Sequence, residues 1–334
     1  MFKKILIASI IVSTTLISCI GEENYENSGN GNFEALWKII DEHYCFFDVA
    51  EEEFGLNWNN VHEKYKAFVD TCENDAELFN TLGDMLKELR DGHVNLISMY
   101  GTSYYWDWQL KNPINFSDSI QRNYLGNNFR LTNGIKCATL SDSIGYAYCE
   151  SFSNGLNINN LSLMLVGFKD CKGLIIDIRN NGGGSLGYSE RLASCFFKEK
   201  TVTGYMRHKT GKCHDCFSDL TEITTDPANA PIDWSDKKVV VLSNRRCYSA
   251  TNDFIVRMKQ APNVTVIGGI TGGGGGMPLS QELPNGWMIR FSAVPMFDSK
   301  MQHTEFGVIP DIEAHISPED KYDTILLSAI YEII

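Results

Sequence analysis

The stretch of residues 239–276, VVVLSNRRCYSATNDFIVRMKQAPNVTVIGGITGGGGG, decides the fold. Its first four residues, 239–242, are valines and a leucine and predict a buried strand, whereas the apolar spacing of residues 254–258 predicts a helix. Ser249 lies between the two segments. The sequence therefore places a serine at a corner where a strand is followed by a helix.

A serine at such a corner has two interpretations. Serine is a preferred N-cap residue, because its hydroxyl accepts a hydrogen bond from one of the first N–H groups of the helix. The same unpaired N–H groups can instead stabilise an oxyanion, and the hydroxyl is then a nucleophile. The local pattern leaves both interpretations of Ser249 open. Cys247 is a weaker candidate nucleophile, because it lies on the turn before the helix.

A second stretch, residues 172–185 with the sequence KGLIIDIRNNGGGS, bears on this choice. Residues 174–176 predict a buried strand, and the loop that follows contains three consecutive glycines, residues 182–184. Consecutive glycines let backbone N–H groups approach a ligand without obstruction by side chains. We expect three polar residues to hold this loop rather than to touch substrate: Asp177, Arg179 and Asn180.

Together the two stretches resemble the core of the C-terminal processing (tail-specific) serine peptidases, a family that includes the tricorn core peptidases. The likeness covers roughly residues 140–315. It implies an α/β fold with a crotonase-like (ClpP-like) β-β-α superhelix as its core, an N-terminal helical domain, and peptide hydrolysis by Ser249. It also implies an oxyanion hole formed by the N–H group of Ala250 and that of Gly183 or Gly184.

The sequence departs from this family at the general base. Many members carry a lysine about 25 residues after the serine, in a motif resembling T-x-G-K-G. Here residues 271–275 read TGGGG, Gly274 stands at the place of the lysine, and no lysine occurs between Lys259 and Lys300. A serine hydroxyl needs a partner that accepts its proton. We therefore expect a different base, and expect the glycines of residues 272–276 to line the substrate cleft.

The tricorn-type branch offers such a base. The resemblance implies that His93, in the segment RDGHVN, takes the proton, because an imidazole titrates near pH ~6.5. It also implies that Glu305, just before the segment GVIPD, belongs to the same network. Other residues remain open for these roles: His303 as the base, and Asp91 or Asp253 as the residue that orients it.

The N-terminus is typical of a bacterial lipoprotein. Lys3 and Lys4 precede a short apolar run, and the segment LISC ends it at Cys19. Residues 1–18 are predicted to be a signal peptide, Cys19 to carry lipid, and residues 19–32 to be an acidic flexible tether. An ordinary secretory signal is the alternative. We expect an exported protein, anchored by lipid to the bacterial cell envelope.

Composition restricts the partners of this 334-residue chain. Its net charge of −13 argues against nucleic acid and against adsorption to anionic membrane surfaces. Of its ten cysteines, Cys213 and Cys216 have a zinc-like spacing, but no second pair of ligands follows. We expect a local disulfide or free thiols there, and neither a metal nor a cofactor.

The remaining segments suggest three further regions. Residues 33–96 show helical apolar stripes and predict an N-terminal helical domain whose last helix ends at Gly92. Residues 97–139 form an aromatic-rich connecting segment, too short for the PDZ domain that many relatives insert near this point. In residues 140–334, the predicted peptidase core, strands alternate with helices, which indicates a mainly parallel sheet.

Two functions follow from these patterns. The first is a serine endopeptidase that acts on extended polypeptide segments through Ser249 and His93. The second is a catalytically inactive protein that binds a peptide or a small ligand in the same cleft, because the family lysine is missing. We favour the peptidase, since the serine, the glycine loop and the histidine are all present.

Overall fold

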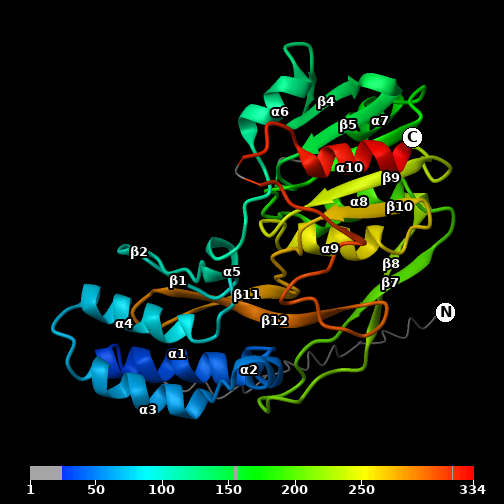
Figure 1. The fold of residues 1–334 in the computed structure, drawn as a ribbon. Helices are drawn as coiled ribbons and strands as arrows, with labels where there is room; N and C mark the ends of the chain where they lie inside the picture. The colour runs from blue at the N-terminus through cyan, green and yellow to red at the C-terminus, as the bar shows by residue number, and fades with distance from the viewer. Residues whose placement is uncertain (1–24, 154–156, 318) are drawn as a thin grey trace, which may run out of the picture.

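A computed structural model of the protein describes residues 25–153, 157–317 and 319–334. The predicted signal peptide of residues 1–18 and the predicted lipidation site at Cys19 lie outside the described residues. Figure 1 shows one half of the molecule built on strands such as β5, β9 and β10, and another half with helices α1 to α4. In the described part, no helix is long and apolar enough to cross a bilayer.

The strand predicted at residues 239–242 lies near the centre of a seven-stranded sheet. It is β9 (Lys238–Ser243), and β6 (Gly173–Asp177) and β10 (Val264–Gly268) pair with it in parallel. The strand order is β13-β10-β9-β6-β5-β4-β3. The other four strands are β3 (Arg130–Thr132), β4 (Ile135–Leu140), β5 (Ile144–Cys149) and β13 (Ile312–Glu313). The carboxyl ends of the parallel strands meet at one edge, where ligands bind in such sheets.

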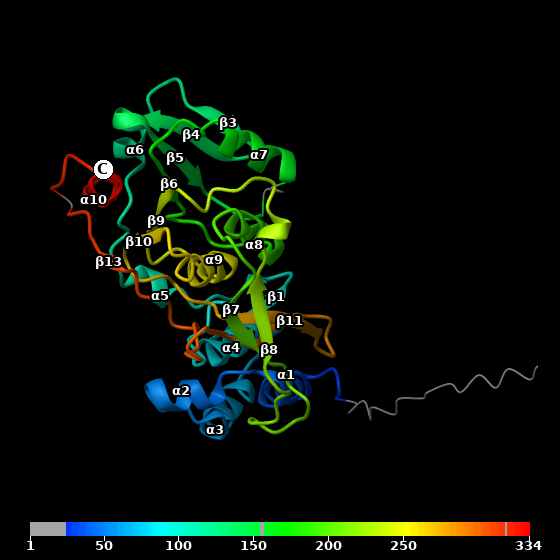
Figure 2. The same cartoon turned by 90° about the vertical axis from the view of Figure 1, so that its right-hand side faces the viewer.

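Helices cover both faces of this sheet, as Figure 2 shows. One face packs against α6 (Asp118–Leu125) and α10 (Thr324–Ile333). The other packs against α7 (Ile158–Val166), α8 (Leu186–Ser194) and α9 (Ala250–Met258). Alternate residues of β9 point to opposite faces. This arrangement explains why the strand is apolar from Val239 to Leu242, and it confirms the prediction of a mixed α/β fold.

The N-terminal helices pack on strands from the opposite end of the chain. They are α1 (Gly29–His43), α2 (Phe47–Phe54), α3 (Trp58–Val69) and α4 (Asp75–Lys87). Their core includes Ile289 and Phe291 of β12 (Met288–Asp298). The helical region predicted for residues 33–96 therefore shares its core with residues far away in the sequence.

Two boundaries differ from the prediction. Helix α1 begins at Gly29, inside the predicted tether of residues 19–32, because the Ser28 hydroxyl caps it by accepting a hydrogen bond from the Gly31 N–H. Helix α4 ends at Lys87 rather than at Gly92. The chain turns at Arg90, which has a left-handed backbone conformation with φ 52°.

A second, antiparallel sheet was not predicted. Its strand order is β2-β1-β12-β7-β8, and β11 pairs with β12. The strands are β1 (Asn95–Ser98), β2 (Gly101–Thr102), β7 (Thr201–Met206), β8 (Thr221–Thr225) and β11 (Gly276–Glu282). Three short helices complete the fold: α5 (Asp107–Leu110), η1 (Ser141–Ser143) and η2 (Pro227–Asn229). Strand β13 of the first sheet consists of two residues only, Ile312 and Glu313.

Candidate active site

The conformation of Ser249 decides between the two interpretations of this residue. An N-cap serine has an extended backbone, and its hydroxyl accepts a hydrogen bond from the helix. Ser249 has φ 58° and ψ −122°, and its side chain makes no capping hydrogen bond to α9. A non-glycine residue in such a region costs about 1–3 kcal/mol, so the surrounding structure must impose it. The hydroxyl is therefore held away from the helix N-terminus that it would otherwise cap.

Two backbone hydrogen bonds impose this conformation. The Ser249 N–H donates to the carbonyl of Gly273 (2.8 Å), and the Tyr248 N–H donates to the carbonyl of Asn181 (3.2 Å). The first bond comes from the glycine run and the second from the glycine loop. The two motifs that the sequence singled out thus meet at the serine.

The side chain of Asn181 connects the glycine loop to helix α9. Its Oδ1 accepts hydrogen bonds from the Gly183 N–H (2.9 Å) and from the Thr251 hydroxyl (2.6 Å). Gly183 has φ 104°, and a Cβ there would lie 2.9 Å from the Ser249 Cβ. Only glycine fits this close approach of the loop to the serine.

The backbone supplies two unpaired N–H groups near Ser249. Ala250 is the first residue of α9, and its N–H has no hydrogen-bond partner among the described residues. The N–H of Gly184 is also free of partners there, whereas that of Gly183 is engaged by Asn181. Gly184 and Ser249 line the same pocket. Of the two glycines predicted for the oxyanion hole, Gly184 thus has the available donor.

The polar residues of the loop hold its shape, as predicted. Arg179 is fully buried, and its guanidinium binds the carboxylates of Asp177 (2.6 Å) and Asp323 (2.7 Å). Asn180 exchanges two hydrogen bonds with Asn244, at 2.9 and 3.0 Å. The loop is therefore fixed to both α10 and the turn before Ser249.

The glycine run has no room for the family lysine. Gly274, which is predicted to stand at the place of that lysine, has φ 75°, and a Cβ there would lie 2.6 Å from the Tyr248 ring. At Gly273, with φ 86°, a Cβ would lie 1.7 Å from the carbonyl oxygen of Glu305. The Tyr248 ring thus occupies the space that a longer side chain at residue 274 would need.

His93 is buried next to this corner. Its ring packs against that of Tyr248, with 4.9 Å between the ring centroids. Burial, aided by the positive charge of Arg290, lowers the pKa of His93 from 6.5 to about 3. Its Nδ1 is buried without a hydrogen-bond partner. No hydrogen bond joins the ring to Ser249, although both residues are described, so the imidazole contacts Tyr248, the residue before the serine, and is not bonded to the serine itself.

Glu305 is buried against the glycine run. Its carbonyl accepts a hydrogen bond from the Gly274 N–H (3.0 Å). Burial and the negative charge of Asp91 raise its pKa well above 4.5. Its Oε2 has no partner. Ser249 and Glu305 therefore bind neighbouring residues of the same glycine run, Gly273 and Gly274.

The alternative residues lie in different environments. Asp91 adjoins His93, because its carboxylate accepts hydrogen bonds from the His93 N–H (2.7 Å) and the Ser292 hydroxyl (2.7 Å). The carboxylate of Asp253 is instead bound by Arg257 (2.8 Å). His303 packs against Phe306 and has a buried, unpaired Nδ1.

Cys247 is poorly suited to act as a nucleophile. It is fully buried, and its thiol donates a hydrogen bond to the carbonyl of Ile178 (3.1 Å). Burial raises the pKa of this thiol to about 12. The reactive thiolate is therefore scarce at neutral pH, which favours Ser249.

A pocket opens beside Ser249 between the two sheets. Of the glycines at residues 272–276, Gly274, Gly275 and Gly276 form part of its wall together with Gly184, whereas Gly272 and Gly273 do not. Seven apolar side chains form another part: Leu186, Ile223, Val256, Met277, Pro278, Met296 and Phe297. Arg290 and Asp253 are the charged residues of the lining. The serine thus lies at the edge of a largely apolar pocket.

Comparison with known proteins agrees with this geometry. Residues 143–314 match the model of peptidase family S41. A crystal structure of a proposed peptidase from Parabacteroides merdae is 47% identical to this chain, with a TM-score of 0.86. The alignment covers 92% of this chain and 98% of that one. The chain belongs to peptidase family S41. Membership of this family supports a serine peptidase.

The N-terminal part of this S41 protein also has a recognised relative. Residues 25–87 match the model of the tricorn protease C1 domain. Mature CPAF is 11% identical, with a TM-score of 0.67 over 91% of this chain and 96% of that chain. Tricorn protease is 15% identical, with a TM-score of 0.53 over 91% of this chain and 36% of its own. These two distant likenesses concern the fold alone.

Three residues of the S41 site were missed in the sequence. Tyr248 directly precedes Ser249, and Asn181 directly precedes the three glycines. Their positions next to these motifs could have identified them. No sequence signal indicated Arg290, because it lies in an ordinary strand pattern within β12. Only the pairing of distant strands brings it to the pocket.

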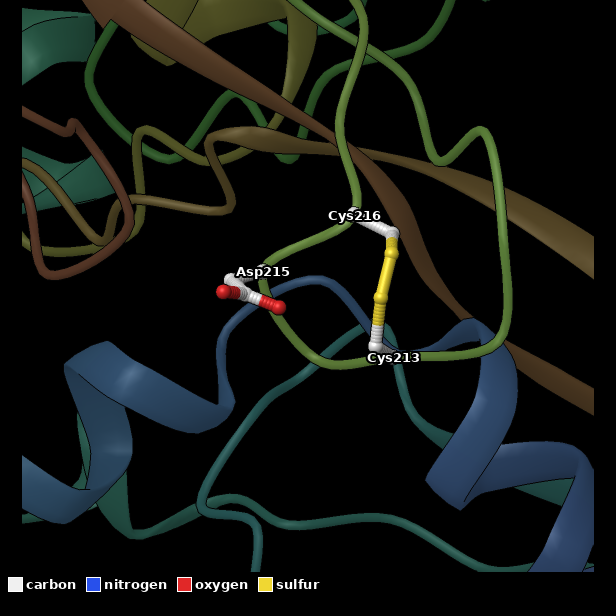
Figure 3. Close-up of side chains that lie close together, drawn as sticks. All are labelled: Cys213, Asp215 and Cys216. Atoms are coloured by element: carbon white, nitrogen blue, oxygen red, sulfur yellow. A yellow bond between two sulfur atoms is a disulfide. The ribbon is translucent and has the colours of Figure 1, made fainter.

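The CHDC segment of this S41 protein lies outside the pocket. Cys213 and Cys216 form a disulfide, one of the alternatives that the spacing left open, and Figure 3 shows it with Asp215. His214 stacks on Phe47 (4.3 Å between ring centroids), and its Nε2 bonds to Asp41 (2.9 Å). Sulfurs that are bonded to each other are not thiolate ligands. The segment attaches the loop between β7 and β8 to the N-terminal helices.

Proposed function

We propose that this S41 protein is a serine endopeptidase in which Ser249 attacks the carbonyl of a bound peptide. The observation that carries the proposal is the strained backbone of Ser249, whose hydroxyl is not used as a cap and borders a pocket. The N–H groups of Ala250 and Gly184 receive the developing oxyanion, with Gly183 supporting the loop. Each such donor contributes about 3 kcal/mol to the stability of the transition state.

In this mechanism His93 accepts the proton of the Ser249 hydroxyl. Its depressed pKa keeps the imidazole neutral, with a lone pair available at neutral pH. The hydrogen bond to the serine forms when substrate is bound, since catalytic hydrogen bonds are often long or absent in free enzymes. Asp91, whose carboxylate accepts a hydrogen bond from the His93 backbone N–H, holds the segment of the base, and Glu305, which interacts electrostatically with Asp91, belongs to the same network.

The substrate is an extended polypeptide segment. Strand β11 continues directly from the glycine run and pairs with β12, and among the described strands it has no second neighbour. Its outer edge can therefore accept a peptide as an additional strand. The apolar wall of the pocket then receives an apolar side chain next to the scissile bond. The chemistry requires no metal or cofactor.

A fluorophosphonate probe tests the nucleophile and the base. We expect the full-length protein to be labelled, and labelling to fall at least about 100-fold in Ser249→Ala and in His93→Ala. His303→Ala is the matched control, because it removes the competing candidate base, and should still be labelled. Loss of labelling in His303→Ala with retention in His93→Ala would move the base to His303.

The alternative function, binding without catalysis, predicts a different result in the labelling experiment. If the folded wild-type protein is not labelled while a related peptidase reacts, Ser249 is not activated. The pocket would then serve to bind a peptide or a small ligand without cleaving it. Titration of unlabelled peptides against the wild-type protein would measure that binding.

We also propose that the protein is exported and attached to the cell envelope by lipid on Cys19. The proposal rests on residues 1–19, where two lysines, a short apolar run and the segment LISC follow one another. Growth with radioactive palmitate should label the wild-type protein and not Cys19→Ala. Cys72→Ala is a suitable control. Labelling that survives in Cys19→Ala would contradict the proposal.

A further inference from the structure

Arg290 places a positive charge in the pocket that contains Ser249. It lies on β12, opposite Asn95 of β1 and Ser280 of β11. Its side chain is half-buried and forms part of the same pocket lining as Ser249. Any peptide that reaches the serine therefore passes near this guanidinium.

The guanidinium is poorly satisfied by the protein itself. Its Nη1 donates two long hydrogen bonds, to the His93 carbonyl (3.5 Å) and to the Asn95 side chain (3.3 Å). Its Nε and Nη2 have no hydrogen-bond partner in the described ranges, and no described carboxylate lies within 4.0 Å of it. An arginine has five N–H donors. Most of them are thus available to a ligand.

Two buried arginines of the same protein, unlike Arg290, are paired with carboxylates. Arg179 binds two carboxylates, and Arg257 binds Asp253 at 2.8 Å. Because Asp253 is already paired, the second charged residue of the pocket lining does not neutralise Arg290. The pocket therefore presents one uncompensated cation, in a protein whose net charge is −13.

The nearby acidic residues do not neutralise the charge of Arg290 either. Asp91 directs its oxygens to the His93 N–H and the Ser292 hydroxyl, and burial raises its pKa. Glu305 is also buried, burial raises its pKa, and its carboxyl group forms no ion pair with Arg290. Arg290 influences Asp91 and His93 through space, but it is not paired with either side chain.

We propose that Arg290 is a specificity-determining residue that binds a carboxylate group of the substrate. This inference deepens the proposed peptidase function and rests on the pocket being the substrate site. A planar guanidinium forms two parallel, charge-assisted hydrogen bonds with a carboxylate. The carboxylate is either an acidic side chain near the scissile bond or the free α-carboxylate of a chain end.

Matched peptides test this proposal and separate the two sources. One pair carries a free C-terminus or its amide with neutral side chains. A second set is amidated and replaces single residues around the cleavage site by Glu or by Gln. We expect the wild-type enzyme to cleave one carboxylate peptide about 10- to 100-fold better, in kcat/KM, than its neutral counterpart.

Three variants test whether Arg290 causes the preference for the carboxylate peptide. In Arg290→Gln the ratio of kcat/KM for the carboxylate and neutral peptides should fall to about one. In Arg290→Lys, which keeps the charge but loses the planar fork, an intermediate ratio should remain. Arg122→Gln, which removes an exposed charge on α6, is the matched control and should keep the wild-type ratio. A wild-type ratio near one, or a preference that persists in Arg290→Gln, would overturn the proposal.

Binding measurements keep this test independent of catalysis. In full-length Ser249→Ala, the carboxylate peptide should bind more tightly than its neutral counterpart, and the added change Arg290→Gln should abolish the difference. If the wild-type protein cleaves no peptide but this binding preference is present, the peptidase function fails and the role of Arg290 stands. If the wild-type protein cleaves both peptides equally well, the peptidase function stands and the role of Arg290 fails. Equal binding of the two peptides to Ser249→Ala would also contradict the role of Arg290.

Discussion

The ring of His93 packs edge-on against the ring of Tyr248, with 4.9 Å between the centroids and 61° between the planes. Tyr248 is the residue directly before Ser249, and its ring also fills the space above Gly274. One aromatic side chain thus positions the candidate base and occupies the place of the family lysine. This relationship supports the proposal that His93, and not a residue of the glycine run, is the base in this chain.

Truncation of Tyr248 should therefore disable the site. Tyr248→Ala removes the ring that His93 packs against, and we expect a loss of about 3–5 kcal/mol in stability together with loss of fluorophosphonate labelling. Tyr248→Phe keeps the ring and removes only a long hydrogen bond to Asp91 (3.4 Å). It should remain folded and labelled. Denaturation and labelling of both variants check this, and a labelled Tyr248→Ala would show that the ring does not position the base.

The buried imidazole of His93 should make the protein sensitive to acid. Its pKa is about 3 in the folded protein and 6.5 in an exposed chain, so protons bind the unfolded state preferentially between these values. The free energy of unfolding should fall, on the order of a few kcal/mol, as the pH drops from 6.5 towards 3. Urea titrations at several pH values measure this slope.

Variants assign the acid sensitivity to His93. His93→Gln should flatten the dependence of stability on pH within that window, because glutamine does not titrate. His208→Gln, which changes an exposed histidine, should leave the slope as it is. An unchanged slope in His93→Gln would mean that the ring is accessible to solvent in the folded protein.

Glu305 should have the opposite effect on stability. Burial raises its pKa well above 4.5, so the folded state keeps a proton that the unfolded chain releases above that pH. This contribution to stability is lost as the pH rises. Glu305→Gln should therefore gain stability relative to the wild type as the pH increases from 4.5, while peptidase activity falls. Thermal melts at pH 4.5 and 8 compare the two proteins, and an equal difference at both values would contradict the shift.

Sequence patterns were informative where burial is continuous. The apolar residues 239–242 and 174–176 predicted the central strands, because a strand covered on both faces is apolar along its length. Strands β7 and β8 were missed because they are rich in polar residues and their pairing contains a register shift. The finer description of the core as a crotonase-like superhelix stays a prediction.

The site was accessible to sequence reasoning only where its residues lie in local motifs. Ser249 could be found because a strand, a helix and a glycine loop mark it. Arg290 could not, because its place depends on the register of β12 against Asn95 of β1, nearly two hundred positions away. Nothing in a single strand pattern encodes that pairing, and the same holds for the contact of Tyr248 with Gly274.

The glycine loop offers a matched pair of substitutions within three residues. Gly183 has φ 104°, and a Cβ there would lie 2.7 Å from the Tyr248 carbonyl oxygen and 2.9 Å from the Ser249 Cβ. A Cβ on Gly182, the residue before it, would meet no atom within 4 Å. Gly183→Ala should therefore push the loop away from Ser249 and lower kcat by about 100-fold, as expected when an oxyanion donor is displaced. Gly182→Ala should stay close to the wild type in kcat and in melting temperature. Because both variants add the same methyl group to the same loop, equal activities would show that the approach of the loop to Ser249 is not needed for catalysis.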